Sequence, residues 1–173
     1  MSELRNMLQD EAKRFPAMGL FPLLPKFVLS KGVEQAGAPL PKVFSRGKSR
    51  ECFRNSAMLA MVSPDKYTYV EGFALPAEAD LRLFPYHHAW LLDKAGNVID
   101  VTWGRPERCE YMGVPFPTHV VSRSALDSGV FGLLDKGMGP DSEFIFQHAP
   151  DLQVEYESYI KSRIPVCNPT IKA

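Results

Sequence analysis

Residues 86–103 read YHHAWLLDKAGNVIDVTW and carry the clearest structural pattern in the chain. Two runs in this stretch, 86–92 and 98–103, are rich in β-branched and aromatic residues, which is typical of β-strands. The five residues between them suit a hairpin with a three-residue loop, in which Gly96 takes the left-handed conformation. The sequence therefore predicts two consecutive antiparallel strands.

The length of this loop sets which residues of the two strands face each other. It pairs His88 with Thr102 and Trp90 with Asp100. The side chains of His88 and Asp100 then point to one face, with their backbones about 7–8 Å apart as diagonal neighbours. A carboxylate at that distance can reach an imidazole and fix its tautomer. A two-residue loop would instead move Asp100 to the opposite face, unless a bulge intervened.

A helix is predicted upstream of the hairpin, over residues 50–62, with Ser49 as its N-cap. Cys52 falls in the first turn of this helix, where the helix dipole and unpaired backbone N–H groups favour a thiolate. A polar side of the helix continues from Cys52 through Asn55, and a separate apolar stripe begins at Phe53. A polar pocket at this end of the helix is therefore expected.

The rest of the chain predicts elements on both sides of this core. Apolar residues at helical spacing over 4–15 predict a helix that Pro16 stops. Five prolines between residues 16 and 41 predict an irregular arm wrapped over the core, with room for one short helix. The other expected elements are a strand over 67–74, a Pro- and Gly-rich turn at 111–117, a short strand at 119–121, a helix opened by Ser124 and a final helix near 151–163.

Length and composition limit the number of domains and the kinds of partner. With 173 residues and 45% apolar side chains, the chain can bury one substantial core, so a single α+β domain over 1–173 is expected. Its catalytic core would span about 49–122, between a helix and proline-rich arm (2–48) and C-terminal helices (123–173). Twenty basic residues balance twenty acidic ones, which argues against nucleic acid or a charged membrane surface as a partner.

No stretch approaches the roughly 18 apolar residues that span a bilayer, and no signal peptide is recognisable, so we expect a soluble cytoplasmic protein. The three cysteines stand at wide, irregular spacings that fit neither a disulfide framework nor a zinc motif. A metal site joining Cys52 with His87 and His88 is disfavoured, because adjacent strand residues point to opposite faces. We therefore expect reduced thiols, no metal and no cofactor.

Cys52 at the start of a helix, His88-Ala89-Trp90 and Asp100-Val101-Thr102-Trp103 follow one another in a pattern that resembles the transglutaminase-like branch of the papain-like superfamily. The resemblance covers residues 52–103. It implies a helix packed on an antiparallel sheet, with Cys52 as nucleophile, His88 as proton shuttle and Asp100 orienting His88. It also implies hydrolysis or acyl transfer at an amide, isopeptide or ester bond, on a protein, a peptide or a small acyl or amide substrate.

Other residues have candidate roles near this triad. The Cys52 backbone N–H is a candidate oxyanion donor, and a second donor could come from Ser45 or from near Asn55. Trp90 and Trp103 are expected to pack close to the triad, with lining of a substrate cleft as the alternative.

Two further questions stay open in the sequence. Glu71 lies in the middle of a predicted strand, where a charge needs a partner; a structural pair with Arg54 or another cation is favoured over a place in the cleft. His87 is expected on the face opposite His88, in a structural or supporting role, while Cys109 and Cys167 look incidental. The alternative function is a catalytically inactive or weak member of the same fold that binds a partner protein through the cleft.

Overall fold

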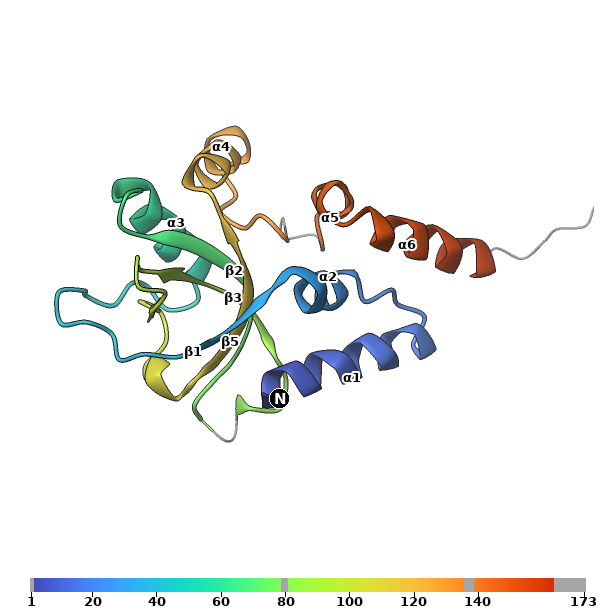
Figure 1. Cartoon of the computed structure of the whole chain (residues 1–173), viewed down its shortest axis with the longest axis horizontal. Coiled ribbons are helices and arrows are strands. Elements are labelled where there is room, and N and C mark those ends of the chain that lie inside the picture. The colour runs from blue at the N-terminus through green and yellow to red at the C-terminus, as the bar shows by residue number, and fades with distance from the viewer. Residues whose placement is uncertain (1, 79–80, 136–138, 164–173) are drawn as a thin grey trace, which may run out of the picture.

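The computed structural model describes residues 2–78, 81–135 and 139–163 (Figure 1). These residues form a mixed α+β structure with six α-helices and a curled five-stranded antiparallel sheet in the order β1-β5-β2-β3-β4. The strands are β1 (Val33–Ala36), β2 (Thr68–Leu75), β3 (Tyr86–Leu92), β4 (Val98–Ile99) and β5 (Glu110–Phe116). The helices are α1 (Glu3–Ala17), α2 (Leu23–Lys31), α3 (Cys52–Val62), α4 (Thr118–Ser128), α5 (Ser142–His148) and α6 (Pro150–Arg163).

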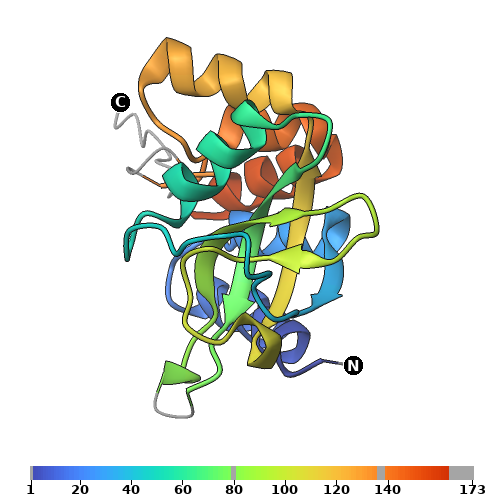
Figure 2. The same ribbon diagram turned by 90° about the vertical axis from the view of Figure 1, so that its left-hand side faces the viewer.

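The two faces of the sheet bury different sets of side chains. Alternate residues of β2, such as Tyr69 and Phe73, join the large core beneath the helices. The intervening residues, such as Val70 and Ala74, join a smaller cluster with Trp90. In Figure 2 the segments 37–51 and 97–109 cross in front of the sheet, while α1 and α2 lie behind it. Both faces of the sheet are therefore covered, one by helices and the other by irregular chain.

The predicted hairpin and its register next to the loop are confirmed, but the predicted pairs His88–Thr102 and Trp90–Asp100 are not part of the β3–β4 ladder, which ends at Leu91 and Ile99. Leu91 pairs with Ile99 and Leu92 with Val98 across β3 and β4. Gly96 has a φ of 83°, the left-handed conformation expected for this loop. The predicted third strand, 98–103, is however wrong in length, because β4 ends at Ile99. The backbone leaves the sheet there because the next carboxylate, on Asp100, binds nearby backbone N–H groups in place of a ladder partner.

The predictions for the proline-rich arm are confirmed in part. The one short helix expected within residues 16–41 is present as α2, which buries Leu23, Leu24, Pro25, Phe27 and Val28. The expectation of an otherwise irregular arm is wrong, because β1 adds a strand to the sheet beside β5. The N-terminal helix also continues past its predicted end and takes Pro16 into its last turn. Pro16 has no backbone N–H and makes no helical hydrogen bond of its own, and the helix ends one residue later, at Ala17.

Three expectations for the second half of the chain are wrong. Residues 111–117 are not a turn, because most of them belong to β5, which pairs with β2 along its whole length. Residues 119–121 lie in α4 rather than in a strand, and Ser124 lies inside that helix. The buried Val121 faces the core beneath the helices, so tertiary packing outweighs the strand propensity of this β-branched stretch. The final helix near 151–163 is present as α6.

The start of the cysteine-bearing helix also differs from its prediction. Glu51, not Ser49, occupies the N-cap position of α3, and the described residues provide no side-chain hydrogen bond there. Arg50 stands just before it with a φ of 64°, which breaks the helical path. The helix therefore begins at Cys52 itself.

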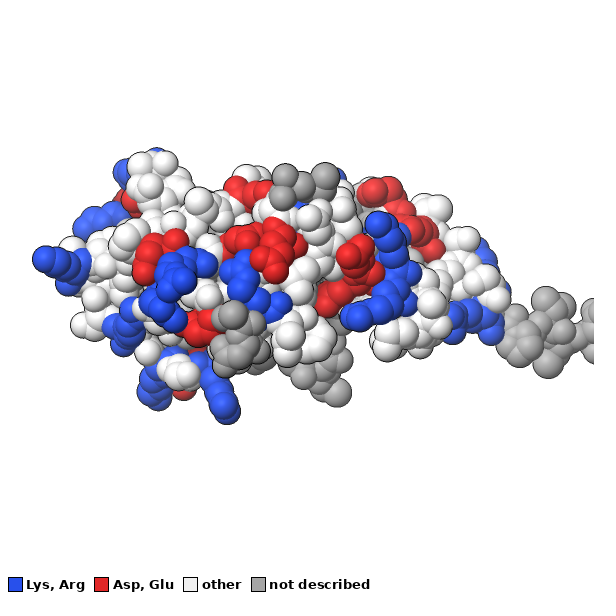
Figure 3. Space-filling view, turned by 90° about the horizontal axis from the view of Figure 1, so that it is seen from below, with Lys and Arg blue, Asp and Glu red and all other residues white. Residues whose placement is uncertain are grey.

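The surface charges and the helices bear on whether a charged partner or a membrane could bind the protein. On the face drawn in Figure 3, Lys and Arg side chains lie beside Asp and Glu side chains rather than in one continuous patch. Among the described residues no helix is both long enough and apolar enough to cross a membrane.

Candidate active site

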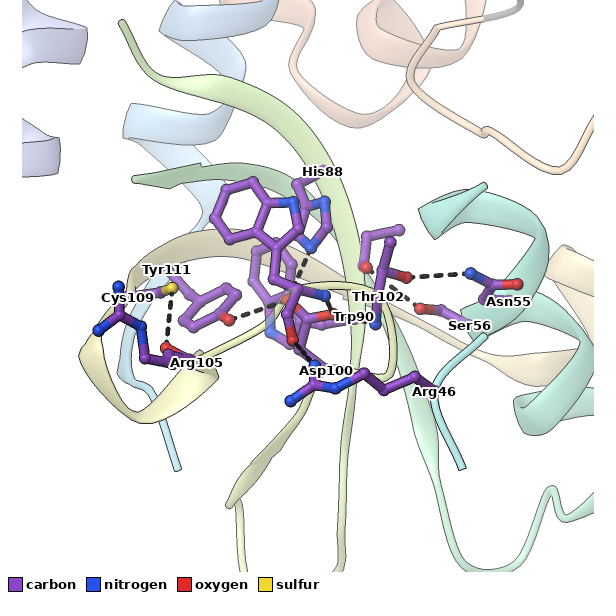
Figure 4. A network of polar contacts seen from close by, with 12 residues as sticks. Arg46, Asn55, Ser56, His88, Trp90, Asp100, Thr102, Arg105, Cys109 and Tyr111 are labelled. Atoms are coloured by element: carbon purple, nitrogen blue, oxygen red, sulfur yellow. Dashed lines mark hydrogen bonds and ion pairs between the residues drawn. The ribbon is translucent and has the colours of Figure 1, made fainter. Parts of the chain in front are cut away.

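Asp100 and His88 form a buried pair at the end of the hairpin (Figure 4). His88 Nε2 donates to Asp100 Oδ2 over 2.8 Å, and the two side chains are 2% and 0% exposed. His88 lies on β3, and Asp100 is the first residue after β4. The hairpin register accounts for this contact, because it places Asp100 across from the strand that carries His88.

The carboxylate of Asp100 accepts three further hydrogen bonds. The phenol of Tyr111, on β5, donates to Oδ2 over 2.9 Å. The backbone N–H groups of Thr102 and Trp103 donate to Oδ1 over 2.8 Å and 3.1 Å. Every oxygen of this buried carboxylate is therefore supplied with donors, and its orientation is set from three segments of the chain.

These contacts determine the protonation states of Asp100 and Tyr111. Burial alone would raise the pKa of Asp100, but the hydrogen bond and the charge of His88, together with the two backbone donors, lower it below its ordinary value. Burial, followed by the charge of Asp100, raises the pKa of Tyr111. Asp100 is thus held as a carboxylate and Tyr111 as a neutral hydrogen-bond donor.

His88 is held in its protonated form between two partners. Burial alone would lower its pKa, but hydrogen bonds to Asp100 and to Cys52, with the charges of both groups, raise it to about 9. Because Nε2 faces Asp100, Nδ1 is the nitrogen left to meet the thiol of Cys52. His88 thus lies between Asp100 and Cys52, and both groups favour its charged form.

Packing along one edge of β3 positions the helix that carries Cys52. Beyond the two residues paired with β4, the carbonyl of Ala89 accepts from the hydroxyl of Ser56 on α3, over 3.1 Å. Asn55, one turn after Cys52, donates to Lys48 O over 2.8 Å and to Thr102 Oγ1 over 3.1 Å. These bonds tie the helix start both to the loop before it and to the segment after β4.

A cleft of about 570 Å³ opens at this point. Cys52, which is 8% exposed, reaches it from the first turn of α3. The residues lining the cleft are Ser49, Arg50, Cys52, Phe53, Pro76, Glu78, Leu81, Tyr86, His87, His88, Thr102, Trp103 and Gly104. The sulfur and the imidazole therefore share one solvent-accessible space of a size suited to a small molecule or a peptide segment.

The two tryptophans occupy different environments. Trp103 lines the cleft and stacks on His88, with ring centroids 4.2 Å apart and planes 22° from parallel. Trp90 is fully buried and is not part of the cleft lining; its Nε1 donates to Gln35 on β1 over 2.7 Å. Trp103 thus restricts the orientation of the His88 imidazole ring by stacking on it. Trp90 links the strand that carries His88 to the edge strand β1.

Glu71 does not pair with Arg54 as expected. Its buried carboxylate accepts from the backbone N–H groups of Leu133 and Leu134, over 2.7 Å and 2.9 Å, and from the hydroxyl of Tyr69 over 3.0 Å. Arg54 instead lies beside Glu51 at the helix start. Two of the three donors to Glu71 are backbone groups more than 60 residues away, and no pattern of complementary charges in the sequence points to them.

His87 points away from His88, as the alternation of the strand predicted. Its Nε2 lies 3.0 Å from Glu71 Oε1, and its ring packs against Phe53 with centroids 4.9 Å apart. Among residues 2–78, 81–135 and 139–163, no group of three or more His, Cys, Asp or Glu side chains is placed to hold a metal ion.

The other cysteines lie apart from this arrangement. Cys109 is buried beside the second core cluster, and its thiol donates to Arg105 O over 3.3 Å. Burial raises the pKa of Cys109 to about 11, which keeps it a thiol near neutral pH. Cys167 lies outside the described residues.

Sequence reasoning missed Tyr111 altogether. The sequence predicts a turn at residues 111–117, and a turn has no alternation of buried and exposed side chains from which the direction of Tyr111 could be inferred. Once the strand is known, its position opposite Ala74 of β2 shows which face it belongs to. The only signal in the sequence was a large aromatic residue with a polar tip, a type that usually finds a hydrogen-bond partner when buried.

Comparison of this chain with protein-family models, with curated proteins and with solved structures finds no match.

Proposed function

We propose that the protein is a cysteine-nucleophile hydrolase or acyltransferase of the papain-like type, in the transglutaminase-like branch, acting on an amide, isopeptide or ester bond. The observation that carries the proposal is the buried His88, which is hydrogen-bonded to Asp100 over 2.8 Å and lines the same open cleft as the Cys52 thiol. A purely structural cysteine needs neither a charged imidazole nor access to a cleft.

The reaction would pass through a thioester. The Cys52 sulfur attacks the carbonyl carbon and forms a carbon–sulfur bond, while His88 gives its proton to the departing amine or alcohol. Water, or an amine in acyl transfer, then attacks the thioester, passes a proton to His88 and displaces the Cys52 thiolate. Hydrolysis and transfer therefore use the same groups and differ only in the second nucleophile.

Asp100 and the helix start have supporting roles in this scheme. Asp100 fixes the orientation of the His88 ring and stabilises its positive charge. The first backbone N–H groups of a helix have no partner within the helix, so the N–H of Cys52 is available to the developing oxyanion. Asn55 is less suited as a second donor, because its amide nitrogen is already bonded to Lys48 O and Thr102 Oγ1.

Alkylation of the native protein tests the thiolate–imidazolium pair. We expect iodoacetamide to label Cys52 rapidly at about pH 6, well below the value of about 8.5 at which a free thiol ionises. Labelling would be followed by mass spectrometry, with the buried Cys109 as an internal control. The His88→Ala variant should lose the reaction at low pH. If Cys52 reacts no faster than Cys109, or is indifferent to His88, the proposal is wrong.

A screen with amide and thioester substrates tests turnover. We expect the wild-type protein to form an acyl-enzyme on Cys52, visible as a mass increase of the intact chain, and Cys52→Ser to form none. Binding of a partner that survives Cys52→Ser, in a protein without turnover, would instead identify an inactive binding module.

A further inference from the structure

We infer that Arg50 is a substrate-binding residue, and that the cleft accepts an acyl group carrying a carboxylate beside an apolar portion. The inference rests on the proposed function, because it concerns the substrate of the same cleft. It comes from one juxtaposition: a guanidinium group with no partner among the residues that the structure describes stands at the wall of the cleft, two residues before Cys52.

Arg50 is the only Lys or Arg among the described residues that line the cleft. Its side chain is exposed and makes no hydrogen bond or ion pair with any residue that the structure describes. A guanidinium group offers five N–H donors in a planar fork that matches a carboxylate. Arg50 therefore has its full binding capacity free for a ligand.

The neighbouring cations are engaged elsewhere. Lys48 and Arg54 both lie beside Glu51, at 3.6 Å and 3.5 Å. The guanidinium of Arg46 donates to the backbone carbonyls of Trp103 and Gly104. Arg50 differs from each of them in having no protein acceptor among the described residues.

The carboxylate on the cleft wall does not neutralise Arg50 either. Glu78 accepts from both Nε and Nη2 of Arg105, over 3.3 Å and 2.8 Å. These bonds lower the pKa of Glu78, so its negative charge is held by Arg105 rather than by Arg50. The charge of His88 is balanced by Asp100, so Arg50 is the cation on the cleft wall that is left to attract an anionic group.

The backbone at Arg50 is also unusual. Its φ of 64° lies in the left-handed region, and no other non-glycine residue of the described chain has a positive φ. An L-residue with a long side chain is strained in this conformation, which Gly or Asn adopts more easily. A charged side chain held in a strained conformation beside a reactive thiol is consistent with a binding role.

The remaining walls of the cleft are mostly apolar. Leu81 and Tyr86 line it while staying 46% and 41% exposed. Tyr86 meets Trp103 edge to face, with ring centroids 6.2 Å apart. Apolar side chains that remain exposed at a cleft mouth suit the apolar part of a ligand. The combination predicts an acyl donor with both an apolar portion and a carboxylate.

Two reagents of the same size test this charge preference without a known substrate. Iodoacetate carries a carboxylate and iodoacetamide does not, and the Cys52 sulfur displaces iodide from either. The ratio of their rates at Cys52, measured by mass spectrometry at about pH 6 and low ionic strength, reports attraction of the anion. We expect Arg50→Asn to lower that ratio about three- to tenfold.

The variants separate charge from folding. Asparagine tolerates the left-handed conformation, so Arg50→Asn removes the charge without adding strain. Arg50→Lys keeps the charge and should retain most of the ratio. Lys48→Gln is the matched control: it removes an equal charge two residues away, from a side chain that does not line the cleft.

The outcomes distinguish failure of the inference from failure of the proposed function. A ratio that falls in Arg50→Asn and stays within about 1.5-fold of wild type in Lys48→Gln supports the inference. A ratio unchanged in Arg50→Asn, with Cys52 still reactive at low pH, overturns the inference and leaves the proposed function standing. A Cys52 that reacts slowly with both reagents in every variant overturns both.

Discussion

Four hydrogen-bond donors converge on the carboxylate of Asp100, and this arrangement explains why a charged pair is stable inside the protein. A carboxylate and an imidazolium lose their hydration when buried, so an unsupported pair would be costly. Here Tyr111 and two backbone N–H groups supply the bonds that water would have made. The geometry of His88 is therefore held by a fully satisfied polar network, which is a suitable support for a proton shuttle.

The raised pKa of His88 makes its contribution to stability depend on pH. In the unfolded chain His88 loses its proton near pH 6.5, whereas in the folded protein it keeps the proton up to about pH 9. The folded state therefore binds more protons between these values, and its stability falls as the pH rises through them. Below about pH 6.5 the contribution is complete.

Urea unfolding of wild type and His88→Gln checks this. We expect the difference in the free energy of unfolding between the two proteins to shrink by roughly 1–3 kcal/mol between pH 6.5 and pH 9.5. Using the difference cancels the titrating groups that do not interact with His88. A difference that stays constant over this range would show that His88 is not held as an imidazolium.

At the scale of elements, the site depends on how closely β2 and β5 approach beside the tryptophan of β3. Gly72 and Gly113 lie opposite each other in the β2–β5 ladder. A Cβ atom on Gly113 would lie 2.6 Å from Trp90 Cη2 and 2.8 Å from Glu71 O. Because Trp90 is fully buried, it has little freedom to move away. The missing side chain at Gly113 is therefore what lets the indole pack against the sheet.

The Gly113→Ala variant tests this packing. We expect it to lower the free energy of unfolding by about 1–3 kcal/mol through overpacking, and to alter the tryptophan fluorescence of the folded protein. Gly104→Ala is the matched control, since a Cβ there meets nothing within 4 Å. Equal free energies of unfolding for the two variants would mean that the Trp90 side chain can move away from a Cβ atom at residue 113 without destabilising the fold.

At the scale of the whole molecule, Glu71 joins parts of the chain that are distant in sequence. Its carboxylate on β2 binds the backbone of Leu133 and Leu134, in the segment between α4 and α5. His87, which also lines the cleft, lies against the same carboxylate. The position of the C-terminal segment is thus linked through one buried side chain to the wall of the candidate active site.

Replacing Glu71 by Gln should loosen this connection. One carboxylate oxygen becomes an NH₂ group, which cannot accept from a backbone N–H, so we expect a loss of about 1–3 kcal/mol in stability. Hydrogen exchange followed by mass spectrometry should show faster exchange around Leu133. Glu78→Gln, which changes an exposed ion pair, should stay within about 0.5 kcal/mol. Unchanged protection at Leu133 would contradict the proposed connection.

The sequence by itself determined the features that depend on neighbouring residues. The hairpin, its loop and its register follow from strand propensity and from Gly96, and the structure confirms them. The register also predicts that His88 and Asp100 share a face, although their hydrogen bond forms beyond the end of the β3–β4 ladder. A helix beginning close to Cys52 could also be predicted, although its cap could not.

Only the tertiary structure decided which distant segments meet. Tyr111 reaches Asp100 because β5 lies beside β2, and Glu71 binds backbone groups in the segment between α4 and α5. Strand β1 forms because β5 offers it an edge, and the β-branched residues 119–121 become helical because their apolar face packs on the core. These outcomes share one physical reason. Each depends on burial and hydrogen bonding between residues far apart in the chain, and such contacts outweigh local propensity without leaving a local pattern to read.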